Sequence, residues 1–174
     1  MRAARDDELD AAGRVVAAAY RAAGGTPEHY LAVVADARSR AGDGEVLVAV
    51  NPGGSVLGSV TLALPGSRLA ELSAPGESEL RMLGVDPSAQ GRGIGRALLH
   101  ACLARARARG AFRMVLSTEP HMDAAHRMYE REGFARAPEL DWEPEPGVAL
   151  IAYALPLARS EPVTPPDPAD AARR

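Results

Sequence analysis

The sequence predicts a mixed α/β domain built around one central sheet. Three observations lead to this fold class. Apolar residues follow a helical period over the first 40 residues, strand-like runs then form a hairpin, and from residue 77 onward strands alternate with helices. A chain of 174 residues is long enough for one such domain with a buried core. We therefore expect a single domain over residues 1–158.

Two helices are predicted at the N-terminus. Acidic residues 6–8 stand where negative charge favours a helix start, and Gly24 with Gly25 ends this first helix at residue 23. Its apolar face comprises Leu9, Ala12, Val16 and Ala19. Thr26 and Pro27 are a typical helix opening, and they predict a second helix that runs to about Arg40.

Three strands follow. Residues 45–50 and 55–64 flank the turn Asn51–Gly54, which predicts a β-hairpin. Residues 77–85 form the third strand after a loop. Regular alternation along it places Leu80, Met82 and Gly84 on one face, and Glu79, Arg81, Leu83 and Val85 on the other.

After the third strand, helices and strands alternate along the chain. The predicted order is a helix over 93–109, a strand over 111–117, a helix over 123–132 and a strand over 147–155. Cys102 falls on the apolar stripe of the first of these helices, so we expect it in the core. Residues 159–174 are rich in proline, alanine and charge, and we expect a disordered tail there.

The composition excludes several classes of protein. A net charge of -3 and a pI of about 5.8 argue against a nucleic-acid-binding protein, which usually carries a basic patch. A single cysteine allows neither a disulfide within the chain nor a cysteine zinc cluster, which fits the reducing cytoplasm, and we expect no metal. No apolar run reaches about 20 residues, so we expect no contact with a membrane. The charged N-terminus does not resemble a signal peptide.

A glycine-rich segment, "QGRGIGR" at residues 90–96, directly precedes a predicted helix. Glycine in a helix costs about 1 kcal/mol relative to alanine, but it allows close approach to the unpaired N–H groups of a helix start. The segment therefore predicts main-chain binding of an anion. A Walker loop needs a lysine after the second glycine, and a dinucleotide fingerprint needs G-x-G-x-x-G, so neither matches. A nucleotide-binding protein remains the more distant alternative.

The segment resembles the pyrophosphate loop of the GCN5-related N-acetyltransferase (GNAT) superfamily. That loop has a glutamine or arginine, two further residues, glycine, any residue, and glycine or alanine, as at residues 90–95 here. The preceding "LGVDP" at 83–87 resembles the family's strand end and turn. Downstream, "AAHRMYEREGF" at 124–134 resembles its second signature, an alanine and a tyrosine before glycine-phenylalanine.

The resemblance implies a mixed, mostly antiparallel sheet flanked by helices, whose strands splay apart where acetyl-CoA binds. The pantetheine arm would bond to the backbone of Leu83 and Val85. The pyrophosphate would lie against the loop and the first turn of the helix, with charge from two arginines. The implied loop residues are Gln90, Gly91, Arg92, Gly93, Ile94, Gly95 and Arg96.

The resemblance also implies catalytic residues. Tyr129 matches the signature tyrosine near the coenzyme sulfur and is the candidate acid for the leaving thiolate. Glu79 is the candidate base, with Glu77 or a chain of water molecules as alternatives. The N–H of Val85 would stabilise the oxyanion.

One position departs from the family pattern. Many members carry an asparagine three residues before the signature alanine, where this chain has Met122. The contact that this asparagine makes with the pantetheine arm or the leaving group is therefore in doubt, and His126 or His121 could replace it.

The expected activity is acetyl transfer to a primary amine of a small molecule or a protein. The family builds its acceptor site from the first two helices and the final hairpin, where this chain has His29, Tyr30, Asp141, Trp142 and Glu143. An acidic wall there would attract a cationic amine. The loop 138–147 could be a lid or a plain connection. A non-catalytic acyl-CoA sensor is the main alternative, and a homodimer is possible.

Overall fold

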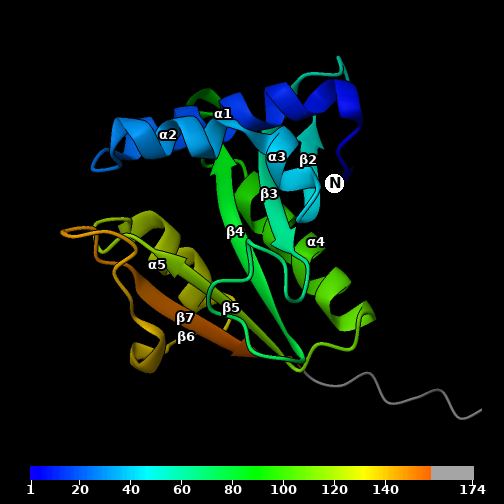
Figure 1. The fold of residues 1–174 in the computed structure, drawn as a ribbon. Coiled ribbons are helices and arrows are strands. Elements are labelled where there is room, and N and C mark those ends of the chain that lie inside the picture. The colour runs from blue at the N-terminus through cyan, green and yellow to red at the C-terminus, as the bar shows by residue number, and fades with distance from the viewer. Residues whose placement is uncertain (158–174) are drawn as a thin grey trace, which may run out of the picture.

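The computed structural model describes residues 1–157, and the expected tail at 159–174 lies outside them. One seven-stranded sheet has the order β1-β2-β3-β4-β5-β7-β6 (Figure 1). Only β4 and β5 pair in parallel, and all other neighbours are antiparallel. The strands are β1 (Arg2–Ala3), β2 (Gly44–Val50), β3 (Val56–Ala63), β4 (Glu77–Val85), β5 (Arg113–Thr118), β6 (Ala135–Arg136) and β7 (Ile151–Pro156).

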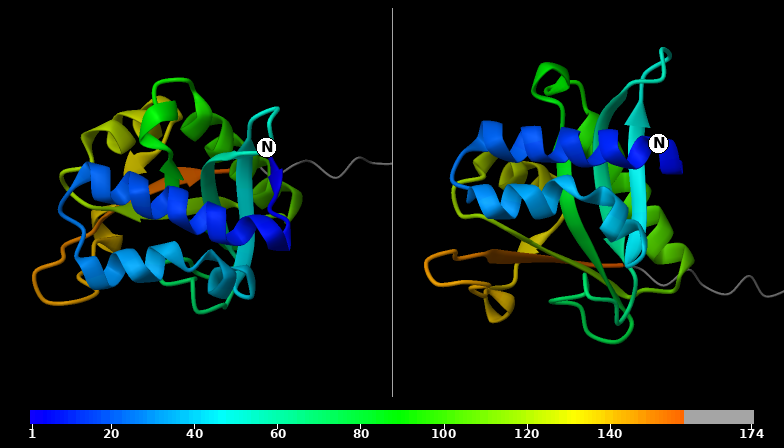
Figure 2. Two further views of the ribbon diagram at one scale, coloured as in Figure 1. Left: turned by 90° about the horizontal axis from the view of Figure 1, so that it is seen from above. Right: turned by 45° about the horizontal axis from the view of Figure 1, so that its top comes forward.

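Helices cover both faces of the sheet, which confirms the predicted fold class. In the two views of Figure 2, α1 and α2 lie on one side of the strands, and α4 and α5 lie on the other. The helices are α1 (Leu9–Ala23), α2 (Glu28–Ala35), α3 (Ala37–Ala41), α4 (Ile94–Ala108) and α5 (Asp123–Arg131). Three short 3₁₀ turns cover Asp6–Glu8, Pro87–Ala89 and Pro138–Leu140. None of the helices within residues 1–157 is long and apolar enough to cross a bilayer.

Alternation along β2 explains how the sheet joins two cores. Leu47 and Ala49 pack in the cluster that contains the buried face of α4, whereas Val46 and Val48 pack against Leu9 of α1. Cys102 is fully buried in the first cluster, as expected, and burial raises the pKa of its thiol to about 12.

Two predicted element bounds were wrong, and two short strands were missed. The second helix ends at Asp36, whose backbone is not helical and whose side chain accepts a hydrogen bond from Ser39 N, so α3 starts anew. The last strand begins at Ile151 instead of residue 147, because only the bridge between Trp142 and Leu150 pairs the preceding segment. The short strands β1 and β6 were not predicted, since two residues leave no periodic pattern.

An irregularity in β4 shapes the rest of the molecule. Against β3 the register slips beside Val60, and Met82 adopts a positive φ of 53°, which marks a β-bulge. The alternation of side chains therefore shifts at this point. Arg81 and Met82 face the α1 and α2 side, while Leu83 packs with the α4 side. The prediction that Glu79 shares a face with Leu83 and Val85 was wrong for this reason.

The parallel ladder between β4 and β5 is short. It joins Glu77 to Arg113 and continues only as far as Leu80 and Leu116. Beyond this point β4 continues to Val85 beside β3, whereas Ser117 and Thr118 pair with β7 alone. The two central strands thus part at the bulge, which confirms the splayed strands that the family resemblance implies.

The N-terminal segment is held by the pairing of β1 with β2 and by one carboxylate. Glu8 accepts two hydrogen bonds from Arg2, at 2.6 and 2.7 Å, and one from Arg5 N at 2.9 Å. These bonds lower the pKa of the Glu8 carboxyl from its usual 4.5 to about 2, and the bonds from Arg2 contribute most to the shift.

We predict that Glu8→Gln is less stable than the wild type at pH 7, and that the difference disappears in acid. A lowered pKa contributes stability that is present above the unfolded-state value and is lost as the pH falls through the folded-state value. The gap should therefore close between about pH 4.5 and pH 2. Urea unfolding of both proteins across this range measures it, and a gap that stayed constant with pH would contradict the assignment.

The close approach of α1 and α2 depends on Gly13. A Cβ at this position would stand 1.8 Å from the carbonyl oxygen of Ala35, which is backbone and cannot move aside. We predict that Gly13→Ala lowers the free energy of unfolding by about 3 kcal/mol. Gly42→Ala is the control, since its Cβ would meet only Ser39 O, at 3.6 Å. Equal stability of the two variants in urea unfolding would refute the prediction.

Candidate functional site

A large cavity of about 990 Å³ lies where β4 leaves β5. Its walls are the C-terminal end of α1, the end of β4, the glycine-rich loop with the start of α4, and one side of α5. Segments separated by a hundred residues thus meet around one opening. This size is typical of a groove that binds a substantial small molecule.

Most of the predicted coenzyme-binding residues line this large cavity. They are Leu83, Val85, Gln90, Gly91, Gly93, Ile94, Gly95 and Arg96. Arg92 is not part of the wall and is exposed on the loop. His126 lies outside it as well, because its ring bonds to the carbonyl oxygen of Glu119 at 3.1 Å and packs on Tyr153.

The glycine loop has a backbone that only glycine adopts readily. Gly91 and Gly93 have φ values of 72° and 77°, in the left-handed region, and Gly93 is the residue that opens α4. A Cβ at either position would have no atom within 4 Å, so the approach to the helix start is open. The unpaired N–H groups of the first turn of α4 therefore face accessible space, as an anion site requires.

Basic side chains add positive charge to the wall. Arg127 and Arg131 stand four residues apart on α5, and both line the large cavity together with Arg96 of α4. Glu132 accepts bonds from His100 and from Arg96, each at 2.5 Å, and these bonds lower the pKa of its carboxyl. Sequence reasoning missed the two α5 arginines, although their spacing of four could have indicated them. The wall combines main-chain N–H donors with guanidinium groups, which suits phosphate oxygens.

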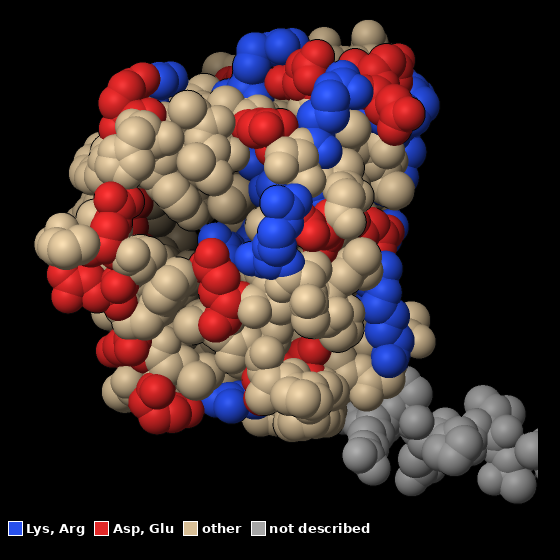
Figure 3. Space-filling model, viewed as in Figure 1, with Lys and Arg blue, Asp and Glu red and all other residues tan. Residues whose placement is uncertain are grey.

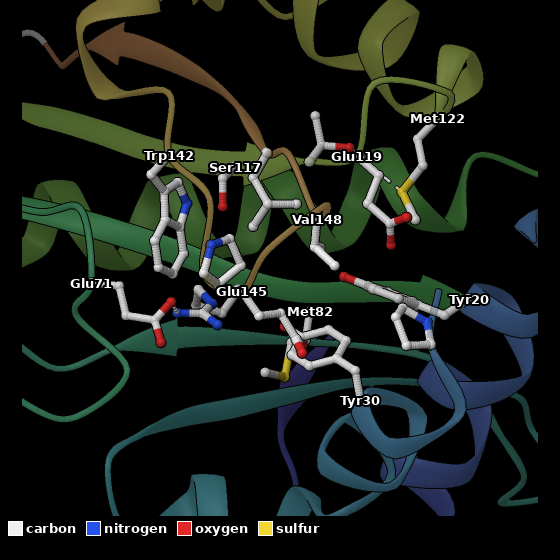
Figure 4. Close-up of a pocket in the computed structure, with 15 residues that line it drawn as sticks. Tyr20, Tyr30, Glu71, Met82, Ser117, Glu119, Met122, Trp142, Glu145 and Val148 are labelled. Carbon is white, nitrogen blue, oxygen red and sulfur yellow. Dashed lines mark hydrogen bonds and ion pairs between the residues drawn. The ribbon is translucent and has the colours of Figure 1, made fainter. Parts of the chain in front are cut away.

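A second, small cavity of about 90 Å³ lies on the α2 side of the sheet (Figure 4). Aromatic and acidic side chains form much of its wall, and Figure 3 shows acidic groups beside a hollow on this face of the molecule. The wall includes Tyr20, Tyr30, Glu71, Arg81, Ser117, Glu119, Met122, Trp142, Glu145 and Val148.

Tyr20 and Met122 line both cavities. Tyr20 comes from α1, and burial raises the pKa of its hydroxyl. Met122 directly precedes α5 and accepts a weak bond from Thr118 Oγ1 at 3.5 Å. The position at which this chain departs from the family pattern thus lies at the junction between the two cavities.

Glu119 lines the small cavity at the end where Tyr20 and Met122 lie, on the segment that joins β5 to α5. Its Oε1 accepts a hydrogen bond from Thr26 Oγ1 at 2.7 Å, and its Oε2 lies 3.7 Å from His121 Nδ1. His121 in turn bonds to the carbonyl oxygen of Gly24 at 2.6 Å and lines the large cavity. Sequence reasoning missed Glu119, because no motif marks it.

Glu79 is placed differently from the expectation. The residue is 1% exposed and lines neither cavity, and its carboxylate accepts bonds from Leu72 N and Ser73 N at 2.8 and 3.1 Å. Burial raises the pKa of the carboxyl, and Arg81 lies 3.6 Å away. Glu79 thus fixes the loop before β4. Glu77 is similarly engaged, by Ala74 N and Arg113.

Tyr129 is the residue by which α5 packs into the main core. Its ring packs on Phe134 and Tyr153, with centroid distances of 5.7 and 6.2 Å. Burial raises the pKa of its hydroxyl, which is therefore protonated at neutral pH. The neighbouring Met128 lines the large cavity, although Tyr129 itself does not.

The expected acceptor residues divide into two groups. Tyr30 and Trp142 line the small cavity, whereas His29, Asp141 and Glu143 do not. His29 instead bonds to Glu145 at 2.8 Å, and Asp141 pairs with Arg136 at 2.7 Å. Within residues 1–157 no group of three histidine, cysteine or acidic side chains is placed to hold a metal ion.

Comparison with known proteins agrees with this geometry. Residues 12–134 match the sequence model of the acetyltransferase (GNAT) family. A mycothiol acetyltransferase from Cellulomonas flavigena is 43% identical over 122 residues, which are 68% of this chain and 34% of that protein. This chain therefore spans about a third of the length of that relative.

Two solved structures show the same fold. An acetyltransferase of the GNAT family from Staphylococcus aureus Mu50 has a TM-score of 0.71 at 14% identity, covering 90% of this chain and 97% of its own. A GNAT family acetyltransferase from Brucella melitensis, solved in complex with acetyl-CoA, has a TM-score of 0.63 at 25% identity, with coverage of 90% and 86%. The family match extends over well over half of the sequence, and the chain therefore belongs to the acetyltransferase (GNAT) family.

Proposed function

We propose that the protein is an N-acetyltransferase that moves an acetyl group from acetyl-CoA to a primary amine by direct attack in a ternary complex. The observation that carries this proposal is the junction at Tyr20 and Met122, where two cavities of different chemistry share a wall. One donor and one acceptor could meet there without a covalent enzyme intermediate.

The large cavity is the proposed site of acetyl-CoA. Its phosphates would be held by the N–H groups of the glycine loop and by Arg96, Arg127 and Arg131. The pantetheine arm would follow the unpaired edge of β4 at Leu83 and Val85, which the early end of the ladder leaves free of β5. Arg92 would contribute only its charge from the loop, and we no longer assign His126 to this site.

The small cavity is the proposed site of the amine. Glu71, Glu119 and Glu145 bring three carboxylates to its wall against one guanidinium, that of Arg81. An excess of negative charge favours a cationic acceptor such as an ammonium group. The ammonium must lose a proton before its nitrogen can attack the thioester carbon.

Glu119 is the group best placed to accept that proton. It lines the small cavity at the end that meets the large one, whereas Glu79 is enclosed under the loop before β4. The nitrogen gives up a second proton as the amide forms, and the departing thiolate takes up one proton. Tyr129 stays the proposed donor to the thiolate on its place in the family signature, since its ring is buried and lines neither cavity, and the second proton from the nitrogen restores its phenol. The N–H of Val85 remains the proposed donor to the oxyanion.

The first test is the binding of acetyl-CoA to the protein and to two glycine variants. We predict that Gly93→Ala weakens binding by at least about 10-fold, because the strained loop moves and the methyl group enters the approach to the helix start. Gly110→Ala is the matched control, since Gly110 has the same φ of 77° and the same open surroundings at the other end of α4. It should bind as the wild type does.

Calorimetric titration measures the three affinities, with ATP and NAD as further controls. Binding of acetyl-CoA by the wild type without any turnover of amines would instead favour the non-catalytic sensor. No binding by the folded wild type would refute the proposed function.

The second test concerns the base. We predict that Glu119→Gln lowers kcat/KM by about 100-fold, because the amide cannot accept the proton of the ammonium group. Glu79→Gln should keep kcat/KM within about 2-fold and lower the thermal stability instead, because the amide no longer compensates the charge of Arg81. The measurements are kcat/KM and the thermal midpoint of the three proteins at one pH. The opposite pattern would return the role of base to Glu79.

A further inference from the structure

The segment that joins β5 to α5 carries a histidine beside the proposed base. Residues 119–122 form a tight turn, Glu-Pro-His-Met, in which Met122 N donates to the carbonyl oxygen of Glu119 at 3.1 Å. Pro120 stands at the second position of this turn, where its fixed φ is favourable. The turn brings two side chains together, so that Oε2 of Glu119 lies 3.7 Å from Nδ1 of His121.

The imidazole of His121 is held by the linker between α1 and α2. Its Nε2 lies 2.6 Å from the carbonyl oxygen of Gly24. The ring also lies against Gly25, where an added Cβ would stand 2.5 Å from Cε1 and 3.2 Å from Nδ1 of the imidazole. The ring is therefore fixed between the linker on one side and the turn on the other.

The bond to Gly24 decides which nitrogen of the ring carries the hydrogen. A carbonyl oxygen can only accept, so Nε2 of His121 is the donor. In the neutral ring Nδ1 then has the free lone pair, and Nδ1 is the nitrogen that faces Glu119. Their separation exceeds hydrogen-bond distance by less than about 1 Å, so a small movement of the carboxylate closes it.

The carboxylate and the imidazole differ in their access to water. The side chain of Glu119 is 13% exposed and lines the small cavity, so an acceptor bound there would cover it (Figure 4). The side chain of His121 is 42% exposed and lines the large cavity instead. A proton on Glu119 thus has a path to solvent through the imidazole.

A carboxylate by itself is a weak acceptor for the proton of an ammonium group. An ammonium group is a far weaker acid than a carboxylic acid, so the proton on the carboxyl returns readily to the amine. Imidazole is a stronger base than a carboxylate, and the negative charge of Glu119 stabilises an imidazolium beside it. Moving the proton on to the imidazole therefore shifts the equilibrium toward the neutral amine, which is the form that attacks.

From these observations, and resting on the proposed function, we infer that His121 is a proton-relay residue that acts through Glu119. Nδ1 takes up the proton that Glu119 has removed from the ammonium group, and Glu119 becomes a carboxylate again. The imidazolium then releases this proton to solvent and returns to its neutral form. The second proton of the nitrogen goes to Tyr129, so one proton is released to solvent for each acetyl group transferred.

The test removes the imidazole from the chain and supplies it from solution. We expect His121→Ala to lower kcat about 10-fold at saturating substrates, because the proton stays on Glu119. Free imidazole should restore most of the lost rate in this variant and leave the wild type unchanged. An unaltered kcat in His121→Ala, or a loss that imidazole does not restore, would overturn the inference.

Two further variants separate the relay from a structural role. In His121→Gln the amide can still donate to the carbonyl oxygen of Gly24, but it cannot carry the proton, so kcat should fall as in His121→Ala. Full activity of His121→Gln would mean that the ring only holds the linker. His100→Ala is the control, because His100 also bonds a carboxylate, that of Glu132 at 2.5 Å, but lines neither cavity. Its kcat should equal that of the wild type with and without imidazole.

The tautomer of His121 gives a readout that does not depend on activity. The ¹⁵N–¹H NMR spectrum of the wild type, with His121→Ala to assign the signal, should show the hydrogen of the neutral ring on Nε2. A hydrogen on Nδ1 would overturn the inference, because that nitrogen could not accept a proton from Glu119. An unchanged thermal midpoint shows that each variant is folded.

The failure of this inference differs from the failure of the proposed function. If the wild type acetylates amines and His121→Gln does so equally well, the relay alone fails. If the folded wild type acetylates no amine, the proposed function fails, and the relay fails with it.

Discussion

The early end of the ladder between β4 and β5 is the constraint on which the rest of the structure depends. A parallel pair that continued to Val85 would close the sheet and leave no opening through its centre. The bulge at Met82 turns β4 away at this point and changes which side chains face α1 and which face α4. The large cavity, the small cavity and their junction all lie around this parting of the strands.

Parts of this arrangement could be predicted from the sequence because their causes are local. The glycine loop requires glycine at its own positions, and the helix that follows shows its apolar stripe directly. The order of helices and strands likewise follows from periodicity, and with the family resemblance it gave the correct fold class. Met122 was noticed because it departs from a known pattern, and it proved to lie between the two cavities.

Other parts could not be predicted, because their causes are distant in the sequence. A methionine at positive φ carries no local signal, so simple alternation placed Glu79 on the wrong face of β4. Glu119 gains its position from Thr26, which is 93 residues away, and from the parting of the strands beneath it.

The burial of Cys102 has a practical consequence for work on this chain. It is the only cysteine of the sequence, and it is fully buried on the inner face of α4. Burial raises the pKa of its thiol to about 12. Such a thiol hardly reacts with disulfide reagents near neutral pH. Coenzyme A released during turnover can therefore be followed continuously with a chromogenic thiol reagent, without a background from the folded protein and without mutating the chain first.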